Sequence, residues 1–557
     1  MISKNVTLKK LFEIFFILSF LIAGMAYSLL PVLEGSHRFI PGDLIDSRIV
    51  HLLLEHGYAS LIGGMDTVWD ASWLFFPYKN NITLTESMIG AVPFYLPFRL
   101  SGFGPAESYQ MWFVLVALLN FISCFFLLRT LKCSILGASA GAFIFSFSMP
   151  VSALINHPQL TLRFFIPASL VFLLYYTHAV RRIHRAVYFL LFSALLSWQF
   201  WACNYTGWFY LFFLFVFFIS AMLYQKNRKF LFAALKKDFL IFAAGGIFSF
   251  AAVLPLLLRL KAHASVRDWA DVLSYTSRVQ SFFYPHSGSF VYRSFLEYFN
   301  NGTDKGLYTL FPGFLATGIL LYKIGEPIYN RFVVRKTDPE IANKDKNCNS
   351  IGNSENSVFE KYSSALSLPL AVTAAFMILS VIRVDDFTLW KWIYYTFPGA
   401  NGIRAVSRVI LVAILPVSVL TAFFITGLEK NKKTGFVYSI LFSVIILFEN
   451  SHFTSHNYSK NDHFQLVAKA EELLRKSGEC RVFYYRDRSM VSLISHVDAM
   501  WASFNTGIPT INGYSGGTPP GWNFDRMESV SVRDLSDWLA LGGADIPEKN
   551  ICIFVLD

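Results

Sequence analysis

Two aspartates lie three residues apart near the start of the chain, just beyond its first long hydrophobic segment. They are Asp43 and Asp46, and they follow Pro41 and Gly42 in a stretch that favours a turn. A carboxylate at a membrane surface can remove a proton from a hydroxyl group, or hold a divalent cation that neutralises a departing phosphate. Both roles would suit a group-transfer reaction such as sugar transfer. One aspartate can instead cap the helix that we expect to begin at Asp46, and capping requires only one of them.

Three arginines lie at or near the ends of later hydrophobic segments. Arg163 lies about one turn inside an apolar segment, where an unpaired charge is costly, so we expect it to pair with a carboxylate or a substrate phosphate. Arg404 and Arg408 are spaced by one helical turn at the start of another segment, a geometry suited to a phosphate or diphosphate group. Extension of these two side chains to the membrane interface explains them nearly as well.

Histidines and a glutamate supply further candidates. His157 precedes a proline at the expected outer end of a segment, where it can act in catalysis, cap the helix or bond a backbone carbonyl. Glu55 and His56, together with His51, can in principle complete a site for Mg²⁺ or Mn²⁺. Their spacing matches no fixed ligand pattern, so the metal dependence stays open.

The composition is that of a protein that crosses a membrane several times. Of 557 residues, 54% are hydrophobic and 15% are charged, with 58 phenylalanines and a mean hydropathy of +0.45. A soluble domain cannot keep so much apolar surface away from water. The net charge of +11 is largely explained by basic residues in the expected cytoplasmic loops, and no basic surface interleaved with aromatic residues stands out. We therefore expect no nucleic-acid partner.

Apolar segments of membrane-spanning or slightly shorter length recur along the chain. Residues 88–103 are interrupted by Pro93, Pro97 and Arg99, so we expect a re-entrant or interfacial segment there. With that segment not crossing, the basic loops face the cytoplasm, as does the N-terminus behind its lysines. We expect about eleven spans, at residues 11–33, 108–128, 135–153, 160–180, 186–203, 206–224, 239–258, 308–322, 365–382, 409–428 and 434–448.

The predicted fold class is an all-α polytopic membrane domain at 1–449, with about eleven transmembrane helices, followed by a small extracytoplasmic α/β domain at 450–557. Within the first, residues 34–107 form an external loop with interfacial helices. Residues 325–364 include a stretch poor in apolar side chains and form a cytoplasmic linker. In the second domain we expect helices at 463–475 and 532–541 and strands at 481–485 and 551–556.

The expected outer domain contains two cysteines and an unusual loop. Cys480 directly precedes the first predicted strand and Cys552 lies at the start of the second, so neighbouring strands can bring them within disulfide distance in an oxidising compartment. Two free, buried thiols are an equal alternative. Residues 505–522 are rich in glycine, proline and asparagine around Tyr514. This loop either covers a site and recognises an acceptor, or is only a rigid structural loop.

Several short motifs occur in an order that resembles one known family. They are Gly42-Asp43-Leu44-Ile45-Asp46-Ser47-Arg48, Glu55-His56, Phe75-Phe76-Pro77, Asn156-His157-Pro158, Phe397-Pro398-Gly399 with Arg404 and Arg408 downstream, and Asn512-Gly513-Tyr514-Ser515-Gly516. Together with the layout of the spans, they resemble the multi-spanning membrane glycosyltransferases of the GT-C fold. His157 stands where that family often has an acidic residue, which argues against a metal-bridged pair of carboxylates.

The resemblance implies an inverting transfer of a sugar from a polyprenyl-phosphate carrier to a lipid-linked glycan, a lipid or a protein, outside the cytoplasm. It implies Asp43 first, and Asp46 second, as the general base. The implied setting is a bacterial inner membrane, with membrane lipids as further partners and Mg²⁺ or Mn²⁺ as a possible cofactor. The candidate substrate-binding residues are Arg48, Glu55, His56, His157, Arg163, Arg404, Arg408 and Tyr514.

Two other classes of function stay open on the sequence. A lipid-linked-glycan transporter or polymerase would also be polytopic, but charges along an intramembrane path would then be expected. A non-catalytic membrane scaffold is the other. The chain has no Gly-x-x-x-x-Gly-Lys-Ser/Thr sequence, so ATP-driven transport is disfavoured.

Overall fold

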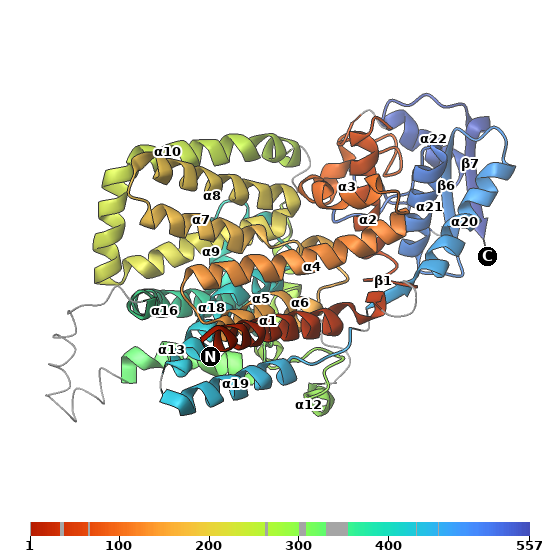
Figure 1. The fold of residues 1–557 in the computed structure, drawn as a ribbon. Helices are drawn as coiled ribbons and strands as arrows, with labels where there is room; N and C mark the ends of the chain where they lie inside the picture. The colour runs from red at the N-terminus through yellow and green to blue at the C-terminus, as the bar shows by residue number, and fades with distance from the viewer. Residues whose placement is uncertain are drawn as a thin grey trace.

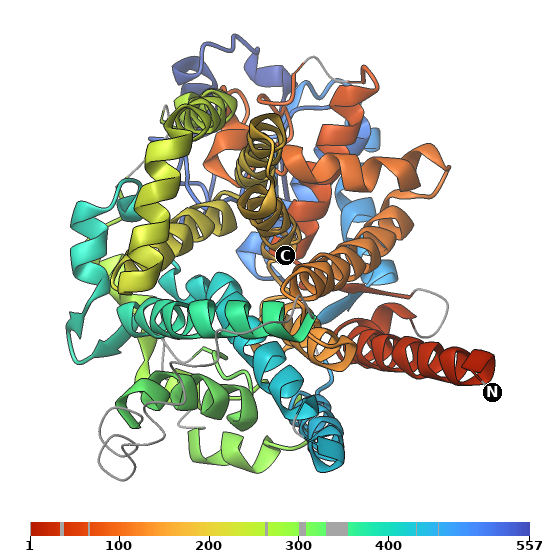
Figure 2. The same cartoon turned by 60° about the vertical axis from the view of Figure 1, so that its left-hand side comes forward.

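The computed structural model of the chain is a long helical bundle with a small α/β domain at one end (Figure 1). It describes residues 2–33, 38–64, 67–261, 266–299, 308–329, 355–430, 432–454, 456–527 and 529–556. The long helices lie side by side, and α2 (Asp46–Leu61) and α3 (Val92–Leu100) lie beside the C-terminal domain. The view turned by 60° shows α1 (Ile2–Leu33) projecting at the edge of the bundle (Figure 2).

Eight helical segments within the described residues are long and apolar enough to cross a membrane, so the chain is a multi-pass membrane protein. They comprise most of α1, α4 (Pro105–Thr130), α5 (Ile135–Phe147) with α6 (Met149–Ser152), η4 (Pro158–Thr161) with α7 (Phe165–His178), α9 (Asn204–Met222), most of α10 (Gln225–Lys261), most of α16 (Glu355–Ser380), and η8 (Val406–Val409) with α18 (Ile410–Glu429).

The other three predicted spans are helices as well. They correspond to α8 (Arg182–Ala202), α13 (Phe314–Tyr329) and α19 (Lys432–Glu449). α13 and the apolar part of α19 are shorter than a full membrane span, and α8 begins with basic residues. For these reasons eight segments, rather than about eleven, are both long and apolar enough to cross a membrane by themselves. The nine-residue α3, which follows η3 (Ile89–Ala91), is only about 14 Å long and cannot cross a membrane alone.

The central contact of the bundle joins α5 to α18. α5 is rich in alanine, glycine and serine, and nearly every residue of both helices is buried. A Cβ atom at Gly141 would lie 2.8 Å from the Ser418 carbonyl oxygen, and one at Gly137 would lie 2.8 Å from the Ala422 carbonyl oxygen. Small residues therefore let the two helices approach closely, as is common in membrane bundles.

The C-terminal domain has an α/β arrangement around two parallel strands. β6 (Val482–Asp487) pairs with β7 (Ile551–Leu556), with Val482 opposite Ile551. The predicted helices and strands are present here, and an additional helix, α21 (Ser492–Thr506), is buried from Ser495 to Ser503. The other elements are α20 (Lys460–Lys476), α22 (Val532–Leu541) and η9 (Glu548–Asn550).

A short antiparallel pair of strands joins the region predicted to be the first external one, between α1 and α4, to the entry of this domain. β1 (Phe39–Pro41) pairs with β5 (Asn457–Ser459), with Phe39 opposite Ser459. Three-residue strands carry no periodic signal, so the sequence does not predict them. This pairing holds the start of α2 close to the C-terminal domain.

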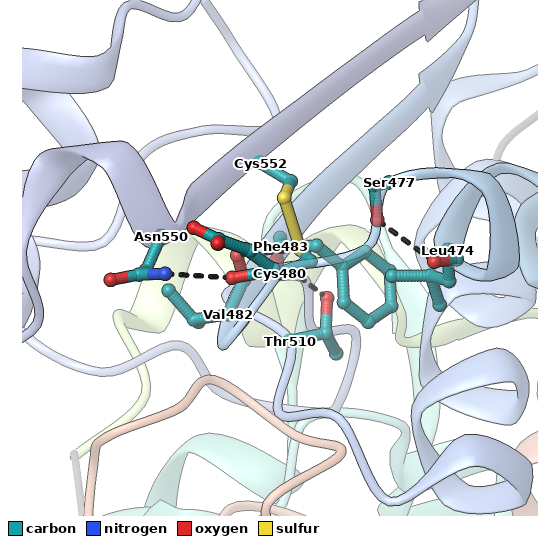
Figure 3. The surroundings of a disulfide bond; sticks show 9 residues. Leu474, Ser477, Cys480, Val482, Phe483, Thr510, Asn550 and Cys552 are labelled. Carbon is teal, nitrogen blue, oxygen red and sulfur yellow. Dashed lines mark hydrogen bonds between the residues drawn. A yellow bond between two sulfur atoms is a disulfide. The ribbon is translucent and has the colours of Figure 1, made fainter.

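The structure contains the Cys480–Cys552 disulfide, the first of the two alternatives (Figure 3). The two Cα atoms are 5.8 Å apart; Cys480 lies two residues before β6, and Cys552 is the second residue of β7. α13 ends at Tyr329 and α16 begins at Glu355, so most of the linker predicted at 325–364 lies outside the described residues.

The remaining short elements lie in the connecting segments. A three-stranded sheet has the order β2 (Ser277–Arg278), β3 (Ile382–Val384) and β4 (Phe387–Thr388). The others are η2 (Asn81–Leu84), α11 (Trp269–Ser274), η5 (Val279–Phe282), α12 (Arg293–Phe299), α17 (Trp390–Thr396) and η7 (Ala400–Gly402).

Candidate active site

Asp46, His157 and Tyr514 meet although they are far apart in the sequence. Asp46 is the first residue of α2, and its side chain is 31% exposed. His157 Nδ1 lies 3.2 Å from Asp46 Oδ2, and the Tyr514 hydroxyl donates a hydrogen bond of 3.4 Å to Asp46 Oδ1. The structure thus brings together three predicted site residues from the first external region, the turn before η4 and the C-terminal domain.

The surroundings of Asp46 favour its ionised form. Burial acts to raise the pKa of Asp46, but the hydrogen bond from His157 and the charges of His157 and Arg408 outweigh it, so the pKa lies below its ordinary value. Asp46 is therefore a carboxylate at neutral pH and remains partly open to solvent. A group of this kind can accept a proton or face a cationic centre.

Asp43 has a different environment. Its Oδ1 accepts hydrogen bonds from the backbone N–H groups of Ile45 (3.0 Å) and Ser47 (3.1 Å), which lie at the start of α2. Burial raises the pKa of Asp43 above its ordinary value, although these hydrogen bonds act in the opposite direction. The capping role that the sequence allows for one aspartate is therefore performed by Asp43.

The turn before Asp43 requires glycine. Gly42 has φ of +107°, and a Cβ atom there would lie 2.3 Å from Ser47 Cβ. The Ser47 hydroxyl donates a hydrogen bond of 2.7 Å to the Pro41 carbonyl oxygen. Because of this close approach, the turn packs against the first residues of α2, and this contact fixes the position of the Asp46 backbone.

Arg408 acts electrostatically on Asp46, and Arg404 acts on Tyr514, the hydrogen-bond partner of Asp46. The Arg404 guanidinium is 4.9 Å from the ring centroid of Tyr275, and that of Arg408 is 4.8 Å from the ring centroid of Tyr205. The charge of Arg408 lowers the pKa of Asp46, and that of Arg404 acts on Tyr514. Within the described part of the chain, neither arginine forms an ion pair or a hydrogen bond through its guanidinium, so both are available to an anion.

Glu86 is a site residue that the sequence analysis missed. It accepts hydrogen bonds from the backbone N–H groups of Asn204 (2.7 Å) and Tyr205 (3.3 Å) at the start of α9. Burial raises the pKa of Glu86, and the two backbone bonds and the charge of Arg408 oppose this. Glu86 thus fixes the tyrosine on which Arg408 packs. Glu86 lies between Thr85 and Ser87 in a largely polar stretch, so no local signal in the sequence marks it.

Arg48 is placed away from this cluster. It is fully buried, its Nη2 lies 2.6 Å from Asp498 Oδ1, and its Nε donates a hydrogen bond of 2.8 Å to His463 Nδ1. Burial and the charge of Arg48 together hold the pKa of His463 far below its ordinary value. Arg48 therefore joins α2 to α20 and α21 of the C-terminal domain, and no substrate can reach it in this arrangement.

Arg163 is also fully buried and bonded within the protein. Its guanidinium donates hydrogen bonds of 2.8 Å to the carbonyl oxygens of Leu411 and Phe145, and it lies 4.5 Å from the Phe145 ring centroid. These contacts join the segment before α7 to α5 and α18. The structure thus satisfies the Arg163 side chain with backbone carbonyls rather than with a carboxylate.

Glu55 and His56 are buried between α2 and its neighbours. Arg99 Nε lies 2.9 Å from Glu55 Oε1, and the Tyr95 hydroxyl donates to the same carboxylate. Trp73 Nε1 donates a hydrogen bond of 3.2 Å to His56 Nδ1. Both residues thus have partners that hold the first external region together, and the structure does not bring them to Asp46.

The described residues contain no group of three His, Cys, Asp or Glu side chains arranged to hold a metal ion. The carboxylates of Asp43 and Glu86 accept hydrogen bonds from backbone N–H groups. The carboxylate of Asp46 contacts the side chains of His157 and Tyr514. Mg²⁺ or Mn²⁺ dependence therefore remains a prediction from the sequence.

Comparison with known proteins identifies the fold. No protein-family model matches the chain, and no curated protein matches its sequence. Among solved structures it is similar to the archaeal oligosaccharyltransferase AglB from Archaeoglobus fulgidus, in complex with an inhibitory peptide and a dolichol-phosphate. The TM-score is 0.51 and the identity 11%, over 91% of this chain and 65% of that one. ArnT from Cupriavidus metallidurans matches with a TM-score of 0.36 and 12% identity, over 91% of this chain and 90% of that one.

The chain thus has the GT-C fold of multi-spanning membrane glycosyltransferases, as its motifs indicate. It spans 65% of the length of the AglB chain that it matches. The predicted fold class, helical spans with a small C-terminal α/β domain, is confirmed by the structure and by this likeness.

Proposed function

We propose that this chain is a membrane glycosyltransferase that takes a sugar from a polyprenyl-phosphate donor. The acceptor is a lipid-linked glycan, a lipid or a protein at the outer face of the membrane. One observation carries the proposal: the ionised carboxylate of Asp46 is within electrostatic reach of Arg408, and its hydrogen-bond partner Tyr514 is within reach of Arg404, and neither guanidinium has an acidic partner in the described structure. The GT-C fold supports the same class of reaction.

The chemistry assigns opposite roles to these groups. Asp46 takes the proton from the acceptor as the acceptor's nucleophilic atom attacks the anomeric carbon, and the bond between that carbon and the phosphate oxygen breaks. The electron pair of that bond leaves with the phosphate, and Arg404 and Arg408 stabilise the negative charge that develops there. Attack from the face opposite the phosphate inverts the anomeric configuration.

Asp46 is preferred to Asp43 as the base in this proposal. Both aspartates are half-buried, but Oδ1 of Asp43 accepts two backbone hydrogen bonds at the start of α2, whereas the carboxylate of Asp46 is oriented by the side chains of His157 and Tyr514. The resemblance to the family ranks Asp43 first, so the test compares Asp43→Asn with Asp46→Asn. Transfer of labelled sugar from polyprenyl-phosphate donors is measured in membranes that contain each variant.

Arg408→Gln is expected to weaken use of the donor. Removing one charged contact to a phosphate costs about 1.5–3 kcal/mol, which corresponds to a roughly 10- to 150-fold fall in kcat/KM for the donor. The kcat/KM of Arg408→Lys should lie between those of the wild type and Arg408→Gln, because lysine keeps the charge but loses the bidentate geometry. The measurement is initial rate against donor concentration, with the exposed Arg293→Gln as the matched control. An equal fall in both glutamine variants would contradict the proposed phosphate contact.

His157→Ala is expected to shift the acid side of the pH–rate profile upward. The hydrogen bond and charge of His157 lower the pKa of Asp46, and without them burial raises it. Because the ionised form of Asp46 is the base, activity disappears as the pH falls through this pKa, and the variant should lose activity at a higher pH than the wild type. A pH series of initial rates checks this, with the exposed His456→Ala as control. A lower rate at every pH with an unshifted profile would assign His157 another role.

A further inference from the structure

A second polar site lies at the turn between α7 and α8. It is a cavity of about 420 Å³ whose lining includes Tyr175, His178, Arg181, His184 and Tyr188. Near the other end of α8, Trp198 Nε1 donates a hydrogen bond of 2.9 Å to the Gly90 carbonyl oxygen in the first external region. Since α8 has 21 residues and is about 30 Å long, the cavity lies at the opposite end of the bundle from the candidate active site.

The donors that face this cavity are largely free. In the residues that the structure covers, the Arg181 guanidinium has no ion pair or hydrogen bond, and the same holds for the ring nitrogens of His184. The hydroxyl groups of Tyr175 and Tyr188 also lack a hydrogen-bond partner there, and their rings pack 5.5 Å apart. The wall of the cavity therefore offers several hydrogen-bond donors and one permanent positive charge.

One wall of the cavity is held by a neighbouring helix. The Tyr362 hydroxyl of α16 lies 2.5 Å from His178 Nε2, and His178 Nδ1 lies 2.8 Å from the Leu174 carbonyl oxygen. The second distance assigns the ring proton to Nδ1, so that Nε2 accepts from Tyr362. The Leu174 carbonyl oxygen and the Tyr362 hydroxyl thus orient the His178 ring, and no bound anion is needed to hold it.

The acidic side chain associated with this turn is already neutralised. Asp238 is buried, its Oδ2 lies 3.2 Å from Arg185 Nη1, and it accepts a hydrogen bond of 2.9 Å from the Tyr176 hydroxyl. Arg185 therefore compensates Asp238, while Arg181 and the neighbouring exposed Arg182 keep uncompensated charges. The electrostatic character of this end of α8 is positive.

Exposed apolar side chains continue from the cavity along α8. Val180 is 93% exposed and Ile183 is 64% exposed, and Val187 and Leu190 follow on the outer surface. In a helix at the edge of a membrane bundle, such a surface lies against lipid chains, while arginine and tyrosine lie at the level of the headgroups. The positive cavity and the apolar surface together match an amphiphile with an anionic head.

We propose that this cavity binds the phosphate headgroup of an anionic phospholipid in the leaflet opposite the candidate active site. Arg181 binds the phosphate oxygens through its planar guanidinium, and the hydroxyl groups of Tyr175 and Tyr188 donate to the remaining headgroup oxygens. The acyl chains lie along the exposed apolar surface of α8. This site is independent of the proposed glycosyltransferase activity, because none of its residues belongs to the cluster around Asp46.

The test measures retention of phosphatidylglycerol by the purified full-length chain, by native mass spectrometry after reconstitution in mixed phosphatidylglycerol and phosphatidylcholine nanodiscs. Arg181→Gln is expected to reduce binding of phosphatidylglycerol more than tenfold. Arg182→Gln, which removes the same charge one residue away, should reduce it by no more than about fivefold, the contribution of one interfacial charge. Tyr188→Phe should give a severalfold loss without any change of charge.

Two results would overturn the proposal. Equal losses in the Arg181 and Arg182 variants, with no effect of Tyr188→Phe, would show only general attraction between basic residues and the membrane. Binding of inorganic phosphate by the chain in lipid-free detergent, with the same dependence on Arg181 and Tyr188, would assign the cavity to a soluble phosphate ligand instead. Circular dichroism of each variant confirms that the helices are intact.

Discussion

Asp46→Asn is expected to reduce sugar transfer by about 10²- to 10⁴-fold, the range that a positioned general base contributes. The asparagine amide has nearly the same shape and retains an oxygen acceptor for Tyr514, so the turn and α2 should be preserved. The amide cannot take the proton of the acceptor. The loss should therefore appear in kcat, with the KM for the donor little changed, in membranes with matched expression.

Asp43→Asn is the matched control for this result. Asparagine caps helices about as well as aspartate, and its oxygen can accept the same bonds from Ile45 and Ser47, so transfer should stay within about tenfold of wild type. The reverse outcome, with transfer lost in Asp43→Asn and kept in Asp46→Asn, would make Asp43 the base. Equal activity in both variants and the wild type would argue for transport or a scaffold function.

Arg48→Met is expected to destabilise the folded chain by about 3–5 kcal/mol, because it leaves Asp498 as a buried charge without its partner. The pair joins α2 to α21, and Asp46 lies two residues before Arg48, so the variant should also lose transfer activity. The measurement is the free energy of unfolding of the purified chain in detergent, together with the activity at a temperature where the variant remains folded.

The double variant Arg48→Met/Asp498→Leu separates this effect from a direct role of Arg48 in binding. Removing both charges should restore most of the stability, because replacing a buried ion pair by apolar side chains is often neutral. Arg526→Met removes an arginine that is 88% exposed beside Asp525, and it should cost less than about 1 kcal/mol. An Arg48→Met variant as stable as wild type would contradict a structural role for the pair.

Local patterns were sufficient for many elements of this fold. The predictions of a helix at 532–541 and of a strand at 551–556 match α22 and β7 residue for residue, and the strand predicted at 481–485 overlaps β6 at 482–485. The helix expected from Asp46 begins at that residue. These elements follow from hydrophobic periodicity and from capping residues, which depend on neighbours a few positions away.

Other elements have no local signature. α21 is buried on all sides over its middle, Ser495 to Ser503, so this part lacks an exposed polar face that would reveal its period. The pairing of β1 with β5 depends on strands more than 400 residues apart. The partners of Arg163 and Glu86 are likewise backbone groups of distant segments.

The sequence by itself determined that this chain is a multi-pass membrane protein with a small C-terminal α/β region, and it placed two aspartates in a turn after the first span. It also supplied Asp46, His157, Tyr514, Arg404 and Arg408 as candidates, because charge and hydropathy are properties of single residues. Only the tertiary structure decided which candidates meet. It placed Asp43 at the helix cap and buried Arg48 against Asp498, since the environment of a side chain depends on segments that pack against it from far along the chain.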